Sequence, residues 1–161
     1  MSDIPALLER FRRGPEIVAM ALTGVFGEEE DFLSAPGKWS VRQIVAHLAD
    51  SEIVAAHRIR QVLAEENPVM TWFDEKLWAV NLDYARRKPK QSLETLRHLR
   101  AENHALLQGV PEAAFERSGT HSVNGPKTLR QMVDAFGTHV EDHARQIMEV
   151  RDAYKAAKGG K

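Results

Sequence analysis

Apolar residues recur at helical spacing along three long stretches of this chain. The last stretch, residues 128–150, opens with Thr128 three residues before Gln131, the pattern of a capping box in which each side chain bonds the other residue's backbone N–H. If each residue turns the helix by about 100°, one side of it is apolar. His139 and His143 lie on or beside that side, one turn apart. Two imidazoles at this spacing can bind one metal ion, although two partly buried core histidines give the same pattern.

A second long helix is predicted from Val41 to about residue 66, where Asn67-Pro68 ends it. Ser40 and Gln43 form another capping box at its start. His47 lies among the apolar positions of this helix. A third helix is predicted over residues 93–108, with Ser92 as its cap and Gly109 after its end.

The N-terminal region is expected to hold a shorter helix. Its apolar spacing over residues 4–13 is interrupted by Gly14-Pro15, and because proline suits the first turn of a helix, a new helix is expected from there to about residue 22. Residues 23–38 are rich in glycine and proline and are typical of a loop.

Two further segments are expected to be irregular. Residues 67–91 hold a short helix near 74–82 together with aromatic and charged side chains, a composition that suits a pocket mouth or a lid of core aromatics. Residues 111–127 contain turn residues and a short hairpin at Asn124-Gly125. His121 lies in this segment with no partner identifiable from sequence.

These elements predict an all-α fold, a four-helix bundle forming a single domain over residues 1–161, with the tail frayed from about residue 155. The facing helices of such bundles build metal sites in their cores.

Composition narrows the functional classes. Hydrophobic residues are 43% and charged residues 28% of the chain, as in ordinary globular proteins. A net charge of −1 gives no reason to expect a nucleic acid partner. No apolar run approaches the roughly 20 residues of a membrane span, and the N-terminus lacks a signal-peptide pattern, so we expect a cytoplasmic protein with no membrane contact. Without cysteine the chain has no disulfide, thiolate ligand or cysteine nucleophile.

The inward-facing histidines suggest a catalytic metal site. His47, His139 and His143 supply three neutral imidazoles from two helices and leave other coordination positions open. Asp50, at i+3 from His47, and Ser51 are candidates for supporting contacts to these ligands.

Four acidic residues lie close to these histidines in sequence, namely Asp50, Glu52, Glu141 and Asp142. The helical phase of Glu141 and Asp142 turns both away from the ion. All four are better explained as a solvated helix face than as catalytic groups.

Three blocks of sequence, in this order, carry a resemblance to a known family. They are Trp39–Gln43 followed by His47–Glu52, the insert Phe73–Ala79, and Gly137–His143. With these blocks the chain resembles the DinB/YfiT-like superfamily, in the YfiT-type branch that includes bacillithiol S-transferases. The similarity covers roughly residues 15–151.

The resemblance implies a four-helix bundle with an up-down-down-up arrangement, which forms a homodimer in many members. It also implies a divalent ion, nickel or zinc, held by His47, His139 and His143. Imidazole ligands alone do not choose between zinc, nickel, copper and iron.

Characterised relatives use a low-molecular-weight thiol, so the resemblance implies activation of such a thiol for transfer to small electrophilic molecules. A metal-dependent hydrolase that uses an ion-bound water is the alternative, and a non-enzymatic, stress-related metal-binding module is a third reading. Residues expected to line the substrate pocket are Arg58, Trp72, Asp74 and Trp78.

Overall fold

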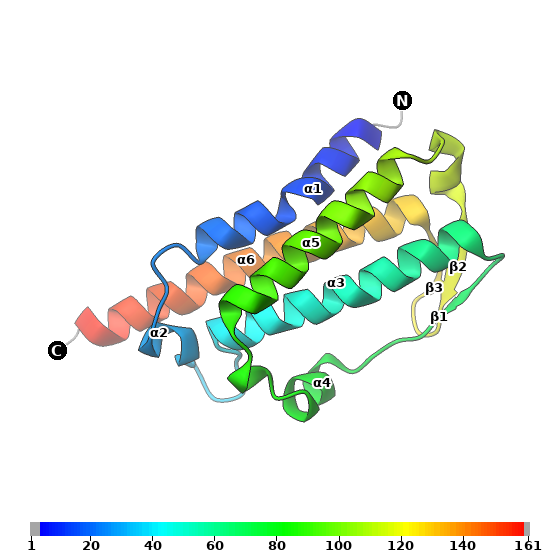
Figure 1. Ribbon diagram of the computed structural model, residues 1–161. Coiled ribbons are helices and arrows are strands. Elements are labelled where there is room, and N and C mark those ends of the chain that lie inside the picture. The colour runs from blue at the N-terminus through cyan, green and yellow to red at the C-terminus, as the bar shows by residue number, and fades with distance from the viewer. Residues whose placement is uncertain (1–3, 160–161) are drawn as a thin grey trace.

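Four long helices form the bundle in the computed structural model, which describes residues 4–159 (Figure 1). They are α1 (Ile4–Ala21), α3 (Val41–Ala64), α5 (Pro89–Gln108) and α6 (Leu129–Gly159). Helices α1 and α6 run in one direction, and α3 and α5 run in the opposite one (Figure 1). The predicted all-α bundle and its up-down-down-up arrangement are therefore confirmed.

Short elements connect the long helices. They are α2 (Glu28–Asp31), β1 (Val69–Met70), α4 (Glu75–Asn81), η1 (Tyr84–Arg86), η2 (Glu112–Glu116), β2 (Ser118–His121) and β3 (Gly125–Thr128). Strand β1 pairs in parallel with β2, which pairs antiparallel with β3. The hairpin expected at Asn124-Gly125 is present, and Gly125 supplies the positive φ of 70° that its turn requires. Neither α2 nor β1 was predicted.

Both predicted capping boxes are present. The Ser40 hydroxyl accepts from Gln43 N, and the Gln43 side chain accepts from Ser40 N. Thr128 and Gln131 make the same reciprocal pair at the start of α6. The two helices that carry the clustered histidines therefore have fixed starting points.

Helix α1 is continuous, so the expected break at Gly14-Pro15 is wrong. Proline removes the N–H that would bond the Phe11 carbonyl. Arg100 of α5 replaces it, since its Nη1 donates to Phe11 O at 2.6 Å. Gly14 makes this approach possible, because a Cβ there would lie 2.8 Å from Arg100 Nη1.

Two other helix boundaries differ from the prediction. Helix α5 begins at Pro89, since proline fits the first helical turn, and Ser92 lies buried inside the helix rather than capping it. Helix α6 continues to Gly159 instead of fraying near residue 155, and Lys158 pairs with Glu28 at 2.6 Å. Residues 160–161 lie outside the described part of the chain.

A polar layer crosses the middle of the apolar core. One apolar cluster lies toward the start of α3 and another toward its end. Between them the buried Arg100 pairs with the buried Glu52 at 2.6 Å, and Asn103 donates to the same carboxylate. The expectation that Asp50 and Glu52 lie on a solvated face is wrong, because both side chains are buried. The partners that let Glu52 be buried, Arg100 and Asn103, come from α5. Because α5 is far away in sequence, the local pattern of α3 could not show this burial.

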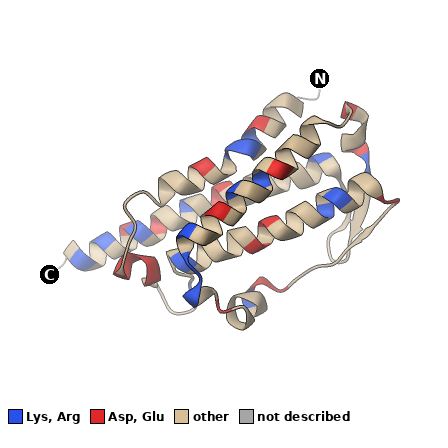
Figure 2. Ribbon diagram, viewed as in Figure 1, with Lys and Arg blue, Asp and Glu red and all other residues tan. Residues whose placement is uncertain are grey.

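Charges of both signs are spread along the helices, and short α2 is wholly acidic (Figure 2). Its carboxylates pair with Arg42 of α3 and with Arg151 and Lys158 of α6. These ion pairs tie the loop before α3 to the bundle. Among residues 4–159, no helix is long and apolar enough to cross a membrane.

Candidate metal centre

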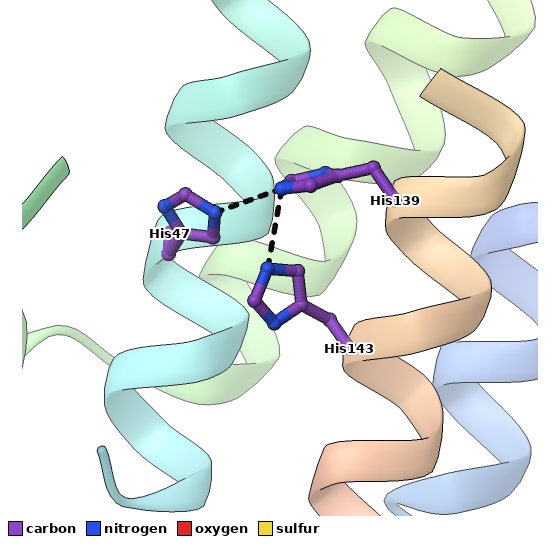
Figure 3. A group of neighbouring side chains, drawn as sticks. All are labelled: His47, His139 and His143. Atoms are coloured by element: carbon purple, nitrogen blue, oxygen red, sulfur yellow. Dashed lines mark hydrogen bonds between the residues drawn. The ribbon is translucent and has the colours of Figure 1, made fainter. Parts of the chain in front are cut away.

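Three imidazole rings converge between α3 and α6 (Figure 3). His47 Nε2 lies 3.0 Å from His139 Nε2, which lies 3.2 Å from His143 Nε2. One ring nitrogen of each histidine falls within 4.8 Å of the others. His47 of α3 and the two histidines one turn apart on α6 thus meet at one point, as the helical phases predicted.

Neighbouring side chains hold these rings in place. The Trp39 ring stacks on His143 at an interplanar angle of 22°, and its centroid lies 4.9 Å from that of His47. His143 Nδ1 lies 2.7 Å from Gln146 Oε1. Because an amide oxygen only accepts, the proton of His143 stays on Nδ1 and its Nε2 keeps a free lone pair. Ser51 Oγ lies 3.3 Å from His47 Nε2.

The fold keeps the three imidazoles neutral. Burial lowers the pKa of His47 to about 3, assisted by the two neighbouring histidines. Burial likewise lowers the pKa of His139 to about 4, assisted by His143 and the Arg100 guanidinium. Burial also lowers the pKa of His143, against the opposing effects of Gln146 and Glu75. Neutral imidazole is the form that binds a metal ion.

The donor set fits a transition-metal ion. Two nitrogens that each lie about 2.0–2.1 Å from one zinc ion are about 3.3–3.4 Å apart in tetrahedral geometry, and about 2.8–3.0 Å apart at right angles. The separations of 3.0 and 3.2 Å fall within this span. Without an ion, the three converging Nε2 atoms have only the Ser51 hydroxyl and one another's ring protons as nearby donors. A shared cation satisfies all three lone pairs.

Two of the three histidines, His47 and His139, lie in the wall of a cavity of about 610 Å³. His47, His139 and Ser51 form one part of its lining, and Phe136 of α6 and the insert before α4 form the rest. A volume of this size suits a small organic ligand. The ion site is therefore open to a reactant.

Glu75, the first residue of α4, brings a carboxylate to this site. Its Oε2 lies 3.8 Å from His47 Nε2, and its charge acts to raise the pKa of His143. The side chain is 53% exposed, so it can exchange protons with solvent. Asp74, the residue that sequence analysis favoured, lines the same cavity, but its Oδ1 caps α4 by accepting from Lys76 N and Leu77 N.

The other expected pocket residues divide between two cavities. Arg58 and Trp72 line both the histidine cavity and a neighbouring cavity of about 650 Å³. Trp78 lines only the neighbouring one, where it packs on Phe73 with a centroid distance of 4.5 Å.

Of the two residues expected to support the ligands, only Ser51 contacts one. Asp50 Oδ1 instead accepts from Arg87 Nη2 at 3.1 Å. Burial raises the pKa of Tyr84, and Asp50 raises it further, although the two groups do not meet ordinary hydrogen-bond geometry. Asp50 therefore interacts with Arg87 and Tyr84 and supports none of the three histidines.

Sequence reasoning missed four residues near the site, namely Trp39, Glu75, His121 and Gln146. Gln146 could have been found from the sequence, since it lies at i+3 from His143 and so on the same helix face. Trp39 could have been noticed as the residue directly before Ser40, which caps the helix that carries His47. His121 gives no periodic signal, because its place depends on the pairing of β2 with β1 and β3.

Sequence comparison connects the chain with known proteins. Residues 10–147 match the profile of the DinB superfamily. A Bacillus subtilis protein named "Putative metal-dependent hydrolase YfiT" is 33% identical over 115 residues, which are 71% of this chain and 65% of that protein. A Bacillus licheniformis protein, also named a putative metal-dependent hydrolase, is 31% identical over 84% of this chain and 78% of its own length.

Solved structures share the fold. The structure of Bacillus subtilis YfiT, described as a probable metal-dependent hydrolase with an unusual four-helix bundle topology, matches with a TM-score of 0.89 and 26% identity. The match covers 96% of this chain and 90% of that one. A mycothiol-dependent maleylpyruvate isomerase matches with a TM-score of 0.73 and 17% identity, over 91% of this chain and 61% of that one.

Proposed function

Because the chain belongs to the DinB superfamily, we propose that it is a metal-dependent enzyme that activates a low-molecular-weight thiol for transfer to small electrophilic molecules. The observation that carries this proposal is the meeting of three neutral imidazoles at their Nε2 atoms, beside a cavity of about 610 Å³ that His47 and His139 line. His47, His139 and His143 would hold the ion, and their nitrogens suit nickel and zinc alike.

A bound ion would supply Lewis acidity, lowering the pKa of a thiol or a water that reaches its open positions. The chain has no cysteine of its own, so a thiol nucleophile has to come from a cosubstrate. The curated relatives named above point to metal-dependent chemistry. The fold is also that of a mycothiol-dependent isomerase, which makes a thiol cosubstrate compatible with this architecture.

Glu75 is the residue best placed to receive the proton of the nucleophile. Its carboxylate lies beside the imidazoles on the cavity side and reaches solvent. In the proposed step the thiol proton passes to this carboxylate, and the sulfur forms a bond to the electrophilic carbon. The leaving group departs with the electron pair of its bond to that carbon, and Glu75 then returns the proton to solvent.

Hydrolysis is the second candidate, favoured by the names of the curated relatives. The same cavity and the same carboxylate would then serve a water in place of the thiol. A hydrolase turns over an ester or amide with no thiol present, whereas the transferase does not.

A thiol-consumption assay tests the proposal. We expect protein loaded with zinc or nickel to accelerate the reaction of bacillithiol, mycothiol or glutathione with chlorodinitrobenzene, and metal-free protein not to. Since the protein contributes no thiol, all consumed thiol belongs to the cosubstrate. Loaded protein that accelerates none of these reactions, yet cleaves a model ester without thiol, would replace the transferase with the hydrolase.

The substitution Glu75→Gln tests the proton acceptor. We expect it to lower kcat by about 10²–10⁴-fold, the usual contribution of a positioned general base, while the protein still binds its metal ion. Asp74→Asn is the matched control, since Asp74 caps α4 and lies one residue away. An equal loss of kcat in both variants would mean that the position of α4, and not the Glu75 carboxylate, matters.

A further inference from the structure

Arg58 is unusual among the arginines of this chain. Most arginines in residues 4–159 pair with an aspartate or glutamate, but Arg58 makes no such pair within that range. Its one hydrogen bond runs from Nη2 to Thr71 O, at 2.6 Å. The side chain is partly buried in the wall of the histidine cavity, and burial lowers its pKa with no carboxylate to offset the effect. A guanidinium has five N–H donors, so most of its donors remain available.

His121 adds a second donor to the same cavity. Its Nδ1 accepts from the backbone N–H groups of Val123 and Asn124, at 3.2 and 3.1 Å. The ring proton must therefore be on Nε2. No described residue makes a hydrogen bond with this Nε2, and the His121 side chain lines the cavity. Arg58 and His121 line the same cavity. Burial lowers the pKa of His121, and the nearby Arg58 charge lowers it further.

We propose that Arg58 and His121 form an anion subsite in the histidine cavity, which binds a carboxylate carried by one of the reactants. The inference rests on the proposed function, since it names a chemical feature of what the cavity binds. The forked guanidinium matches the two oxygens of a carboxylate, and the imidazole N–H supplies a further donor. Trp72 and Phe136, which line the same cavity, offer apolar surface to the body of such a molecule.

The bond from Arg58 to Thr71 O does not by itself account for an arginine here. A neutral donor could satisfy one carbonyl oxygen without the cost of burying a charge. The cavity lining also holds the Glu75 carboxylate, which lies 3.8 Å from His47 Nε2. An anion is therefore drawn to the Arg58 part of the cavity and away from Glu75, which orients the molecule that carries it.

Binding of benzoate, compared with its neutral counterpart benzamide, tests the subsite. The full-length protein is titrated calorimetrically with each compound, as purified and again after dialysis against a chelator. We expect benzoate to bind about tenfold or more tightly than benzamide, because a hydrogen-bonded ion pair adds at least that much affinity. The difference should persist in the dialysed protein, which separates this test from any failure of the metal-dependent reaction.

Four variants locate the charge responsible. Arg58→Met should bring the benzoate affinity to within about twofold of that for benzamide, and Arg58→Lys should retain part of the preference. Lys76→Met removes the other cation of the cavity lining, and Arg86→Met removes an exposed charge elsewhere. Both should keep the preference. Equal affinities for the two compounds in wild type, a preference that survives Arg58→Met, or one that is lost with Lys76→Met would each overturn the proposal.

Kinetics of the loaded enzyme then show which reactant carries the carboxylate. One assay pairs mercaptopropionate with chlorodinitrobenzene, and the other pairs mercaptoethanol with chlorodinitrobenzoate. Arg58→Met should raise the KM of the carboxylate-bearing reactant about tenfold in one of these assays. An effect in the first places the anion on the thiol, and an effect in the second places it on the electrophile. A KM unchanged in both assays would contradict the subsite.

Discussion

His143 and His47 differ in how their second ring nitrogens are held. His143 Nδ1 donates to Gln146 Oε1 at 2.7 Å, which fixes both the tautomer and the ring orientation. His47 Nδ1 is buried without a partner among the described residues, so a tilted contact with the Trp39 ring and the packing of α3 hold that ring. A hydrogen bond to the ring nitrogen that does not face the ion, such as the one with Gln146, orients a metal-binding imidazole and raises its basicity.

Loss of the Gln146 contact should weaken ion binding. We expect Gln146→Ala to reduce zinc affinity about 10- to 100-fold, the usual effect of removing a hydrogen bond behind a ligand. Competition with a chelating dye measures the affinity. Gln131→Ala, which removes a cap of the same helix far from the site, is the control. If both variants bind zinc as tightly as wild type, Gln146 has no role in orienting His143.

At the scale of single elements, sequence periodicity predicted the parts of the chain whose neighbours are local. The phases of α3 and α6 placed His47, His139 and His143 correctly on facing sides, and the capping boxes marked where both helices begin. The continuity of α1 could not be predicted, because the donor to Phe11 O is supplied by Arg100, 89 positions away.

The roles of Asp74 and Glu75 also could not be predicted from local sequence. Asp74 and Glu75 are adjacent carboxylates, and only the actual start of α4 decides that the first caps the helix and the second faces the imidazoles. Sequence reasoning favoured Asp74 as the pocket residue. The position of His121 depends on strand pairing between segments about 50 residues apart, which no local pattern encodes.

The buried pair of Arg100 and Glu52 links α1, α3 and α5, and the two charges should depend on each other. We expect Arg100→Met to cost about 3–5 kcal/mol of stability, because it leaves Glu52 buried without a counter-charge. The double variant with Glu52→Leu should cost less than the sum of the single changes, by about 2 kcal/mol. Denaturant unfolding of the four proteins measures this coupling.

A surface pair provides the comparison for that cycle. Arg97 and Glu94 lie 2.7 Å apart on α5 with both side chains 43% exposed, so their coupling should stay below about 0.5 kcal/mol. Equal coupling energies for the two pairs would mean that the buried layer contributes no more than an exposed ion pair.

At the scale of the whole molecule, the polar layer that divides the apolar core lies at the level of the histidine site. The Arg100 guanidinium acts on His139 and lowers its pKa, so the layer and the site are electrostatically connected. The bundle therefore buries neutral imidazoles at a place where protonation is strongly disfavoured. This arrangement predisposes the site to bind a metal ion and makes the metal-free fold sensitive to acid.

The stability of the metal-free protein should fall as the pH drops below about 6.5. The pKa of His47 is about 3 in the folded protein, so between these values the unfolded chain binds a proton that the folded one does not. Stability is thus fully present above pH 6.5 or so and is lost toward the folded pKa, by about 1.4 kcal/mol per pH unit for one such group.

Denaturant unfolding of metal-free protein between pH 7 and 5 or so measures this slope, in a range where few carboxylates titrate. His47→Gln, which cannot take up the proton, should show a shallower dependence than wild type. Identical slopes in the two proteins would contradict the idea that burial keeps His47 neutral.

The most direct test of the central claim is the metal content of the purified protein, measured by plasma mass spectrometry. Wild type is compared with His47→Ala on α3, His143→Ala on α6, and the surface control His98→Ala on α5. We expect about one equivalent of a transition metal in wild type and in the control, and its loss in both cluster variants without loss of helical content. A full equivalent retained by either cluster variant, or a folded wild type that takes up neither zinc nor nickel, would contradict it.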